Sequence, residues 1–202
     1  MAHKKGIKVC VDGAQSVGMF PFDIHELECD FYTASSHKWL FAPKGTGFLY
    51  ARKDRIGELK PLLLNRHFGE TDIRMLEAYN TRNLPEVLGL GAALEYHQLL
   101  GPKVKAERIY KLKDYFRQQL HKDDRFVFKT PADHDLSAGI QLVEVKNKPV
   151  SEVQEALMSE YQIDCRPMYS HGLNALRISL SVFVTLKALD FLTPALKNIA
   201  SA

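Results

Sequence analysis

The sequence predicts an α/β protein that combines a mainly parallel sheet with a small C-terminal α+β domain. Three observations predict this class. Short apolar runs separated by polar residues or glycine fill residues 1–83, helical apolar spacing dominates residues 84–121, and strand and helix patterns alternate over residues 122–202. We therefore expect a first α/β segment, a pair of connecting helices and a small domain, with these boundaries.

The first segment carries three runs that are typical of buried strands. They extend from Ile7 to Val11, from Phe31 to Ala34 and from Gly47 to Tyr50. The residues from Asp23 to Leu27 predict a short helical link between the first two strands. The weak periodicity of residues 57–83 indicates a long irregular segment, and such segments in compact domains are often functional.

Two helices and a second set of strands are expected after this segment. Gly101 and Pro102 interrupt the helical pattern, so we expect one helix before them and one after them. The expected helices are Leu84 to Leu99, Val104 to Leu120, Ser151 to Tyr161 and Leu186 to Ile199, and the expected strands are Phe126 to Lys129, Gly139 to Val145, Ile163 to Arg166 and Leu176 to Leu180. Ser151 and Gln154 predict a capping box for the third helix.

The amino-acid composition narrows the classes of function that this protein can have. The 202 residues are 46% hydrophobic and 25% charged, with a formal charge of +3 that is spread evenly along the chain. These values are typical of a soluble globular protein and do not indicate binding to nucleic acid or membranes. Three widely spaced cysteines argue against disulfides and favour a cytoplasmic location, and the histidines show no spacing that indicates a metal site.

Asp12 and Lys38 each follow a predicted strand. Their separation of 26 residues (38 minus 12) is enough for one crossover that returns to the same sheet edge, so the two side chains can face one pocket. Pyridoxal phosphate (PLP) chemistry needs a lysine amine to form a Schiff base and a carboxylate to keep the pyridine nitrogen protonated. Taken alone, such an acid is more often a helix cap or turn former, and such a lysine is usually a solvated surface charge.

The surrounding residues carry a family resemblance. The run from Asp12 to Gln15, the run from Ser35 to Leu40 and the run from Ala42 to Tyr50 together resemble the core signature of class V aminotransferases. This family includes isopenicillin-N epimerase-like proteins and cysteine desulfurases and has the fold of the PLP-dependent aspartate aminotransferase superfamily. The resemblance implies that residues 1–83 are part of the PLP-binding large domain.

The resemblance also implies roles for individual residues. Lys38 would form the Schiff base with the cofactor, Asp12 would pair with the pyridinium nitrogen, and Gln15 would hydrogen-bond the ring hydroxyl. Ser35 and His37 would hold the phosphate.

Two later segments extend the resemblance over nearly the whole chain. Thr81 lies in a loop that usually reaches across a homodimer interface to the partner's phosphate, although Asn80 stands here in place of the usual glycine. Arg177 resembles the arginine that binds the α-carboxylate of the substrate, a role that suits a planar guanidinium. A structural ion pair is the alternative role for Arg177.

The sequence argues against cysteine desulfurase activity. Those enzymes need a nucleophilic cysteine on a loop shortly before the carboxylate-binding arginine, and residues 166–174 contain none. Cys165 lies on the preceding predicted strand, where we interpret it as a small buried hydrophobic residue.

Family members are about twice as long as this chain, and the resemblance covers only their second half. We therefore expect a fragment of a PLP-dependent class V aminotransferase or isopenicillin-N epimerase-like enzyme that acts on an amino acid through Lys38 and lacks the N-terminal half. The alternative is a non-catalytic remnant or interaction module that keeps the fold without the activity. The full-length enzyme would be a homodimer.

Overall fold

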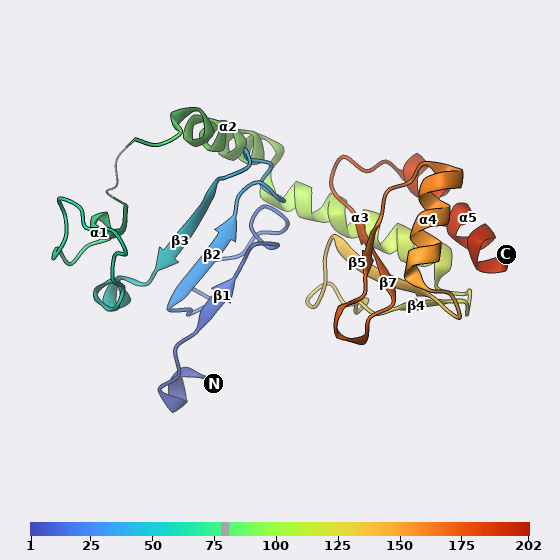
Figure 1. Cartoon of the computed structure of the whole chain (residues 1–202), viewed down its shortest axis with the longest axis horizontal. Helices are drawn as coiled ribbons and strands as arrows, with labels where there is room; N and C mark the ends of the chain where they lie inside the picture. The colour runs from blue at the N-terminus through green and yellow to red at the C-terminus, as the bar shows by residue number, and fades with distance from the viewer. Residues whose placement is uncertain (78–80) are drawn as a thin grey trace. The chain divides into compact units, whose positions relative to one another are not determined.

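The computed structural model describes residues 1–77 and 81–202. The protein is a mixed α/β protein, as the sequence predicted, and it divides into two compact units, Met1–Pro102 and Lys103–Ala202. Figure 1 shows the order of the elements along the chain. The helices expected as a connecting pair are α2, in the first unit, and α3, which lies almost wholly in the second.

The first unit contains a three-stranded sheet with the order β1-β2-β3. The strands are β1 (Cys10–Asp12), β2 (Phe31–Ser35) and β3 (Gly47–Ala51), close to where the apolar runs predicted them. β1 and β2 are parallel, whereas β2 and β3 are antiparallel (Figure 1). The parallel pair places the carboxyl ends of β1 and β2 at the same edge of the sheet.

The link between β1 and β2 is not helical, so the helix predicted from Asp23 to Leu27 is wrong. These residues form turns, in which the Asp23 carboxylate accepts a hydrogen bond of 2.7 Å from the backbone N–H of His25. Aspartate forms such a local bond readily, and the bond competes with helix formation. The remaining short elements of this unit are η1 (His3–Lys5), η2 (Lys53–Glu58) and α1 (Arg74–Glu77).

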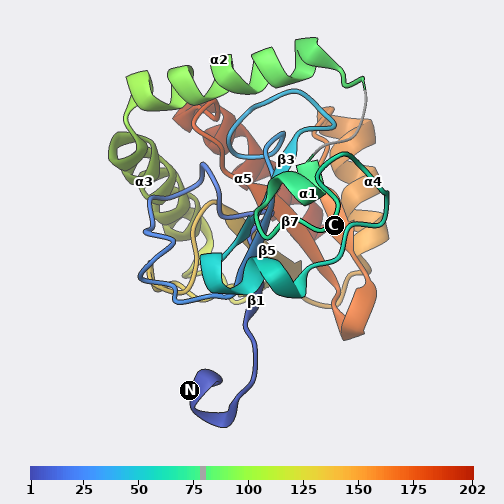
Figure 2. The ribbon, with the colours of Figure 1, turned by 90° about the vertical axis from the view of Figure 1, so that its left-hand side faces the viewer.

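The helix α2 (Leu84–Leu100) confirms the first helical prediction. Gly89 lies so close to Pro43 that a Cβ at position 89 would be 2.5 Å from Cγ of the proline ring. α2 therefore packs against the loop between β2 and β3, as Figure 2 illustrates. None of its residues is buried, although the helix is strongly apolar.

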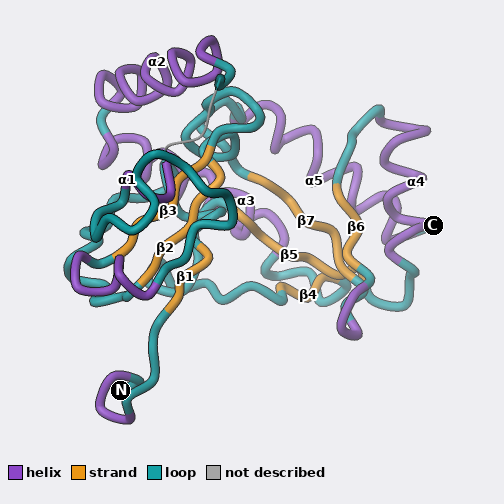
Figure 3. The backbone as a smooth tube through the Cα atoms, turned by 60° about the vertical axis from the view of Figure 1, so that its left-hand side comes forward, coloured by secondary structure: helices purple, strands orange, loops and turns teal. Residues whose placement is uncertain are grey.

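The second unit is a four-stranded sheet with the order β4-β5-β7-β6, and every pairing in it is antiparallel. Figure 3 shows its strands together with the helices of this unit. The elements are α3 (Pro102–Leu120), β4 (Phe126–Phe128), β5 (Ile140–Val145), α4 (Val150–Tyr161), β6 (Arg166–Met168), η3 (Ser170–Gly172), β7 (Ala175–Ser179) and α5 (Leu186–Ser201).

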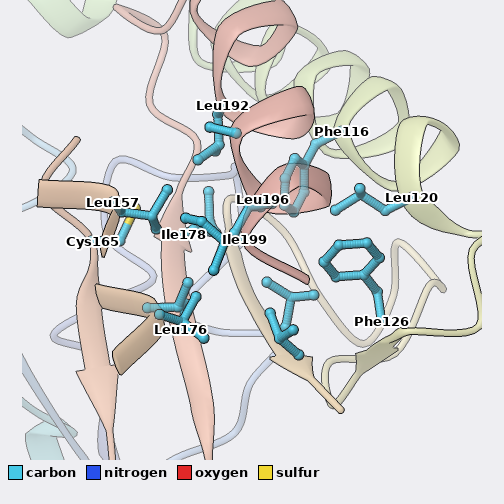
Figure 4. Close-up of a cluster of buried hydrophobic side chains, with 14 of the residues drawn as sticks. Phe116, Leu120, Phe126, Leu157, Cys165, Leu176, Ile178, Leu192, Leu196 and Ile199 are labelled. Carbon is cyan, nitrogen blue, oxygen red and sulfur yellow. The ribbon is translucent and has the colours of Figure 1, made fainter. Parts of the chain in front are cut away.

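One hydrophobic core holds the second unit together (Figure 4). Phe116 of α3, Leu157 of α4, Leu176 of β7 and Leu196 of α5 are all buried in it. All three long helices of the unit therefore cover the sheet, and this core positions β7 and the edge strand β6.

Two local predictions for this unit are wrong. The strand predicted over residues 163–166 is shifted, because β6 begins only at Arg166. The capping box at Ser151 does not form, because α4 already begins at Val150, whose N–H donates a 2.7 Å hydrogen bond to the side-chain oxygen of Asn174. A residue distant in sequence thus replaces the local cap.

None of the helices in the described part of the chain combines the length and apolar character needed to cross a bilayer.

Candidate functional site

Asp12 ends β1 at the carboxyl edge of the first sheet. It is exposed, and its Oδ1 accepts a 3.0 Å hydrogen bond from the backbone N–H of Ala14. The backbone N–H of Gly13, the residue after Asp12, donates a 2.7 Å hydrogen bond to the carbonyl of Thr33 on β2. These two bonds hold the carboxylate beside the end of β2.

Gly13 is required for this arrangement. A Cβ at position 13 would lie 1.9 Å from Cζ of Tyr32, so only glycine leaves room for the tyrosine ring. The Tyr32 hydroxyl is 2.6 Å from Oγ of Ser16, and burial raises the pKa of this phenol. Tyr32 therefore stays protonated and supports the turn that follows Asp12.

Lys38 lies in a short closed loop after β2. The N–H of Ser36 donates to the carbonyl of Thr46, and the N–H of Ala42 donates to the carbonyl of Ser36, both at 3.1 Å. Lys38 is half-buried, and its amine has no hydrogen bond or ion pair within the described residues. His37, beside it, is exposed.

Two contacts join the Asp12 turn to the Lys38 loop. The indole N–H of buried Trp39 donates a 2.9 Å hydrogen bond to Oε1 of Gln15. At Gly18, which has a φ of +80°, a Cβ would lie 2.7 Å from the backbone of Trp39 and Leu40. The structure thus brings the segments of Asp12, Gln15 and Lys38 together in one unit.

The contact with Trp39 also orients the amide of Gln15. An indole N–H can only donate, so the amide oxygen must face Trp39 and the NH₂ group must point in another direction. The predicted task of Gln15, a hydrogen bond to the ring hydroxyl of PLP, needs this NH₂ donor.

The two serines before His37 differ in their environments. Ser35 ends β2, opposite Gly47, and is half-buried. Ser36, which was not predicted to be a site residue, is fully buried, and its Oγ has no hydrogen-bond partner among the residues that the structure describes. A buried hydroxyl without a partner is costly, so it marks a place where a polar ligand can bind.

Thr81 is exposed, and within residues 1–77 and 81–202 its side chain forms no hydrogen bond with the residues above. Its neighbour Asn80 lies outside the described residues. The role of Thr81 toward a phosphate across a dimer interface stays a prediction.

Arg177 lies on β7, in the second unit, and is half-buried. Its Nε is buried and has no hydrogen-bond acceptor in the described part of the chain. The structural ion pair that was the alternative role is not found within the described residues, while the role in carboxylate binding stays a prediction.

Cys165 is buried at 8% exposure, which confirms its interpretation as a small buried hydrophobic residue. Burial raises the pKa of its thiol to about 11. Since the thiolate is the nucleophilic form, this cysteine is unreactive near neutral pH.

Sequence reasoning missed Trp39, Ser36 and Arg166, which lies directly opposite Arg177 on the neighbouring strand. Trp39 is the single tryptophan of the chain and follows Lys38, and this position was the available signal. No sequence signal marked the burial of Ser36 or the pairing of Arg166.

The residues at this edge of the first sheet fit PLP. The cofactor needs a carboxylate, an amine, an orientable amide donor and hydroxyl groups for its phosphate, and Asp12, Lys38, Gln15 and the pair Ser35 and Ser36 supply them. The partnerless Oγ of Ser36 supports this fit most directly. No group of three metal-ligating side chains is found in the part of the chain that the structure describes.

The model of the family described as aminotransferase class V matches residues 1–191. The isopenicillin N epimerase of Streptomyces clavuligerus is 29% identical over 212 residues, which cover 96% of this chain and 53% of that enzyme. A cysteine desulfurase of Escherichia coli (strain SE11) is 38% identical over 130 residues, which cover 59% of this chain and 32% of that enzyme. The chain thus spans about half the length of the isopenicillin N epimerase.

Solved structures share the fold. The cysteine desulfurase CsdA from Escherichia coli has a TM-score of 0.83 at 25% identity, with 99% of this chain and 53% of that chain covered. The cystine C-S lyase C-DES, in complex with its reaction product cysteine persulfide, has a TM-score of 0.80 at 25% identity, with 96% and 52% covered. A lysine-to-alanine variant of C-DES, with glycine covalently linked to its PLP cofactor, has a TM-score of 0.79 at 24% identity, with 96% and 51% covered.

Proposed function

Because this chain belongs to the class V aminotransferase family, we propose that it is the lysine-bearing part of a PLP-dependent enzyme that acts on an amino acid. The contact between the Asp12 turn and the Lys38 loop, made by Gln15 and Trp39, carries this proposal. It supports the proposal because a carboxylate and an amine, the two groups that PLP requires, belong to the segments that this contact joins.

When bound, PLP supplies an electron sink that makes the α-proton of an amino acid acidic. Asp12 keeps a proton on the pyridine nitrogen, and the Ala14 N–H leaves Oδ2 of this carboxylate for that task. Gln15 donates its amide N–H toward the ring hydroxyl. Ser35 and His37 would hold the phosphate, together with the buried hydroxyl of Ser36 between them.

Lys38 has two tasks in the proposal. Its amine would hold the cofactor, and the same amine would move the α-proton of the bound amino acid. Arg177 binds the α-carboxylate of the substrate through its guanidinium fork. Thr81 contacts the phosphate of a partner subunit in a homodimeric, cytoplasmic enzyme.

Aminotransfer or epimerisation is the proposed reaction rather than desulfuration. Isopenicillin N epimerase matches nearly the whole chain, whereas the cysteine desulfurase matches 59% of it. Residues 166–174 contain no cysteine, and the buried, protonated thiol of Cys165 cannot replace a desulfurase nucleophile. Assays with amino-acid donors separate aminotransfer from epimerisation, because only aminotransfer yields a keto acid.

A second candidate function is a non-catalytic remnant or interaction module. The surface of α2 favours it, because this helix exposes apolar side chains such as Leu88 and Leu99. The two candidates differ in one observable property, because a remnant need not bind PLP.

Titration of the 202-residue chain with PLP tests the proposal. We expect a new visible absorption band and quenching of the fluorescence of Trp39, the only tryptophan. Lys38→Ala removes the band, whereas Lys44→Ala, which changes an exposed lysine of the same loop, preserves it. A band that survives Lys38→Ala contradicts the role of Lys38, and the absence of any band in the unaltered chain favours the remnant.

A further inference from the structure

The second unit contains a cavity of about 530 Å³. The cavity is lined by residues 162–166, by residues 177–180, by Val184 and by residues of α5 between Ala188 and Leu192. Arg166 and Arg177 both belong to its lining. A volume of this size accommodates a small metabolite.

The two arginines are direct neighbours across the sheet. Arg166 of β6 and Arg177 of β7 are register partners in an antiparallel pair, so their side chains lie on the same face. Two like charges in directly opposite positions destabilise a sheet. An anion between the two guanidinium groups would remove this repulsion.

The protein itself supplies little compensation for this repulsion. Within the described residues, neither guanidinium forms an ion pair with an acidic side chain, and Nε of Arg177 is buried with no acceptor. Asp164 is the one acidic residue among the described residues of the lining, and it forms no ion pair with either arginine there. An unpaired guanidinium nitrogen in a cavity lining is what a site for an acidic ligand requires.

We propose that Arg166 and Arg177 form a two-arginine site that selects ligands with two acidic groups, one for each guanidinium. The site would make the substrate an amino acid with an acidic group on its side chain. The assignment of the α-carboxylate to Arg177 rests on the proposed function. Arg166 then determines specificity, because a planar guanidinium binds a carboxylate through two parallel hydrogen bonds.

Binding of simple acids to the 202-residue chain tests this site without PLP. We expect glutarate and succinate to bind at least about tenfold more tightly than butyrate and propionate in calorimetric titrations, because a second charge-assisted interaction adds to the first. Equal affinities for the dicarboxylates and the monocarboxylates would overturn the proposal.

Three variants assign the effect to Arg166. We expect Arg166→Gln to reduce glutarate affinity about tenfold or more and to leave butyrate affinity unchanged, and Arg166→Lys to give an intermediate loss. Lys111→Gln removes the same charge from an exposed position of α3 outside the cavity and should change neither affinity. An equal loss of glutarate affinity in Lys111→Gln and Arg166→Gln would overturn the assignment, since it would indicate a general charge effect.

This test and the PLP titration can fail independently. If PLP binds at Lys38 but dicarboxylates show no preference, the two-arginine site is wrong and the proposed function stands. If dicarboxylates bind through Arg166 but PLP does not bind, the site stands and the proposed function fails.

Discussion

The residue after Asp12 determines how closely the first two strands approach. Tyr32 occupies the space that a side chain at position 13 would need, since a Cβ there would be 1.9 Å from the ring. Tyr32 is itself buried, at 1% exposure, and hydrogen-bonded to Ser16, so it cannot move aside without loss. The geometry of the carboxylate at Asp12 therefore depends on a glycine.

We predict that Gly13→Ala lowers the free energy of unfolding of the first unit by about 1–3 kcal/mol, the usual cost of overpacking. Denaturant titration followed by Trp39 fluorescence measures it, because this single tryptophan lies in the first unit. Gly91→Ala, at a position of α2 with open space around it, is the control and should be neutral or stabilising. Equal effects of the two substitutions would contradict the packing argument.

At the residue scale, the sequence supplied the members of the candidate site, and their roles stay predictions. Asp12, Gln15, Ser35, His37 and Lys38 were predicted because they follow two apolar runs and carry family motifs. The hydrogen bond between Gln15 and Trp39 spans 24 residues and arises only from folding, so no local pattern reveals it. Burial of the hydroxyl of Ser36 likewise depends on the closed loop around it.

Among the elements of the first unit, a buried aspartate joins segments that lie outside the sheet. Asp30, immediately before β2, accepts hydrogen bonds from the N–H of Val9 at 2.7 Å and from Nε of Arg55 at 2.9 Å. It also pairs with His3 at 2.8 Å and with Arg52 at 3.0 Å. The N–H of Val9, then His3 and Arg55, hold the pKa of this carboxyl well below its ordinary value of 3.8.

This lowered pKa makes the stability of the first unit depend on pH. Because the folded pKa is below the unfolded one, the contribution of Asp30 is complete above about pH 5 and is lost as the pH falls from about 4 toward the folded pKa. We predict that Asp30→Asn destabilises the unit at pH 7 and that its difference from the unaltered chain shrinks below about pH 4. Trp39 fluorescence during denaturant titrations from pH 7 to pH 2.5 measures both quantities.

Asp54→Asn is a matched control for this titration. Asp54 also pairs with Arg52, but its side chain is 60% exposed, so we expect a much smaller effect at pH 7. A difference between Asp30→Asn and the unaltered chain that stays constant down to pH 2.5 would show that the lost carboxylate is not the cause.

The strands show why sequence patterns predict some elements and miss others. β2 and β3 were predicted to within one residue of their observed ends, since apolar runs ended by polar residues and glycine mark strands well. β6 was misplaced because Ile163 and Cys165 are apolar outside the strand, whereas Pro167 lies within it. Proline is tolerated there because β6 is an edge strand.

At the scale of the whole molecule, the two units differ in their cores. The core of the second unit unites α3, α4, α5 and the strands, whereas the described cluster under the first sheet consists of Cys29, Tyr32 and Ala34 with half-buried neighbours. Units with such different cores need not unfold together.

We predict that the second unit is the more stable one. In hydrogen-exchange mass spectrometry of the intact chain, the amides of β5 and β7 should remain protected longer than those of β1 and β2, since exchange follows the free energy of local opening. Identical protection in both units, lost in a single cooperative step, would contradict this prediction.

The chain as a whole spans about half the length of the isopenicillin N epimerase. α2 carries Leu84, Leu88 and Leu99 on its surface, each more than half exposed. We propose that the end of β1 and the loop after β2 form one PLP site around Lys38.

Mapping where PLP attaches tests this claim most directly. The chain is incubated with PLP, reduced with borohydride to make the lysine linkage permanent, and digested for mass spectrometry. We predict that the cofactor is found on Lys38, that it is lost in Lys38→Ala, and that it is retained in Lys44→Ala. Attachment spread over many exposed lysines, with Lys38 no more modified than Lys44, would contradict the claim.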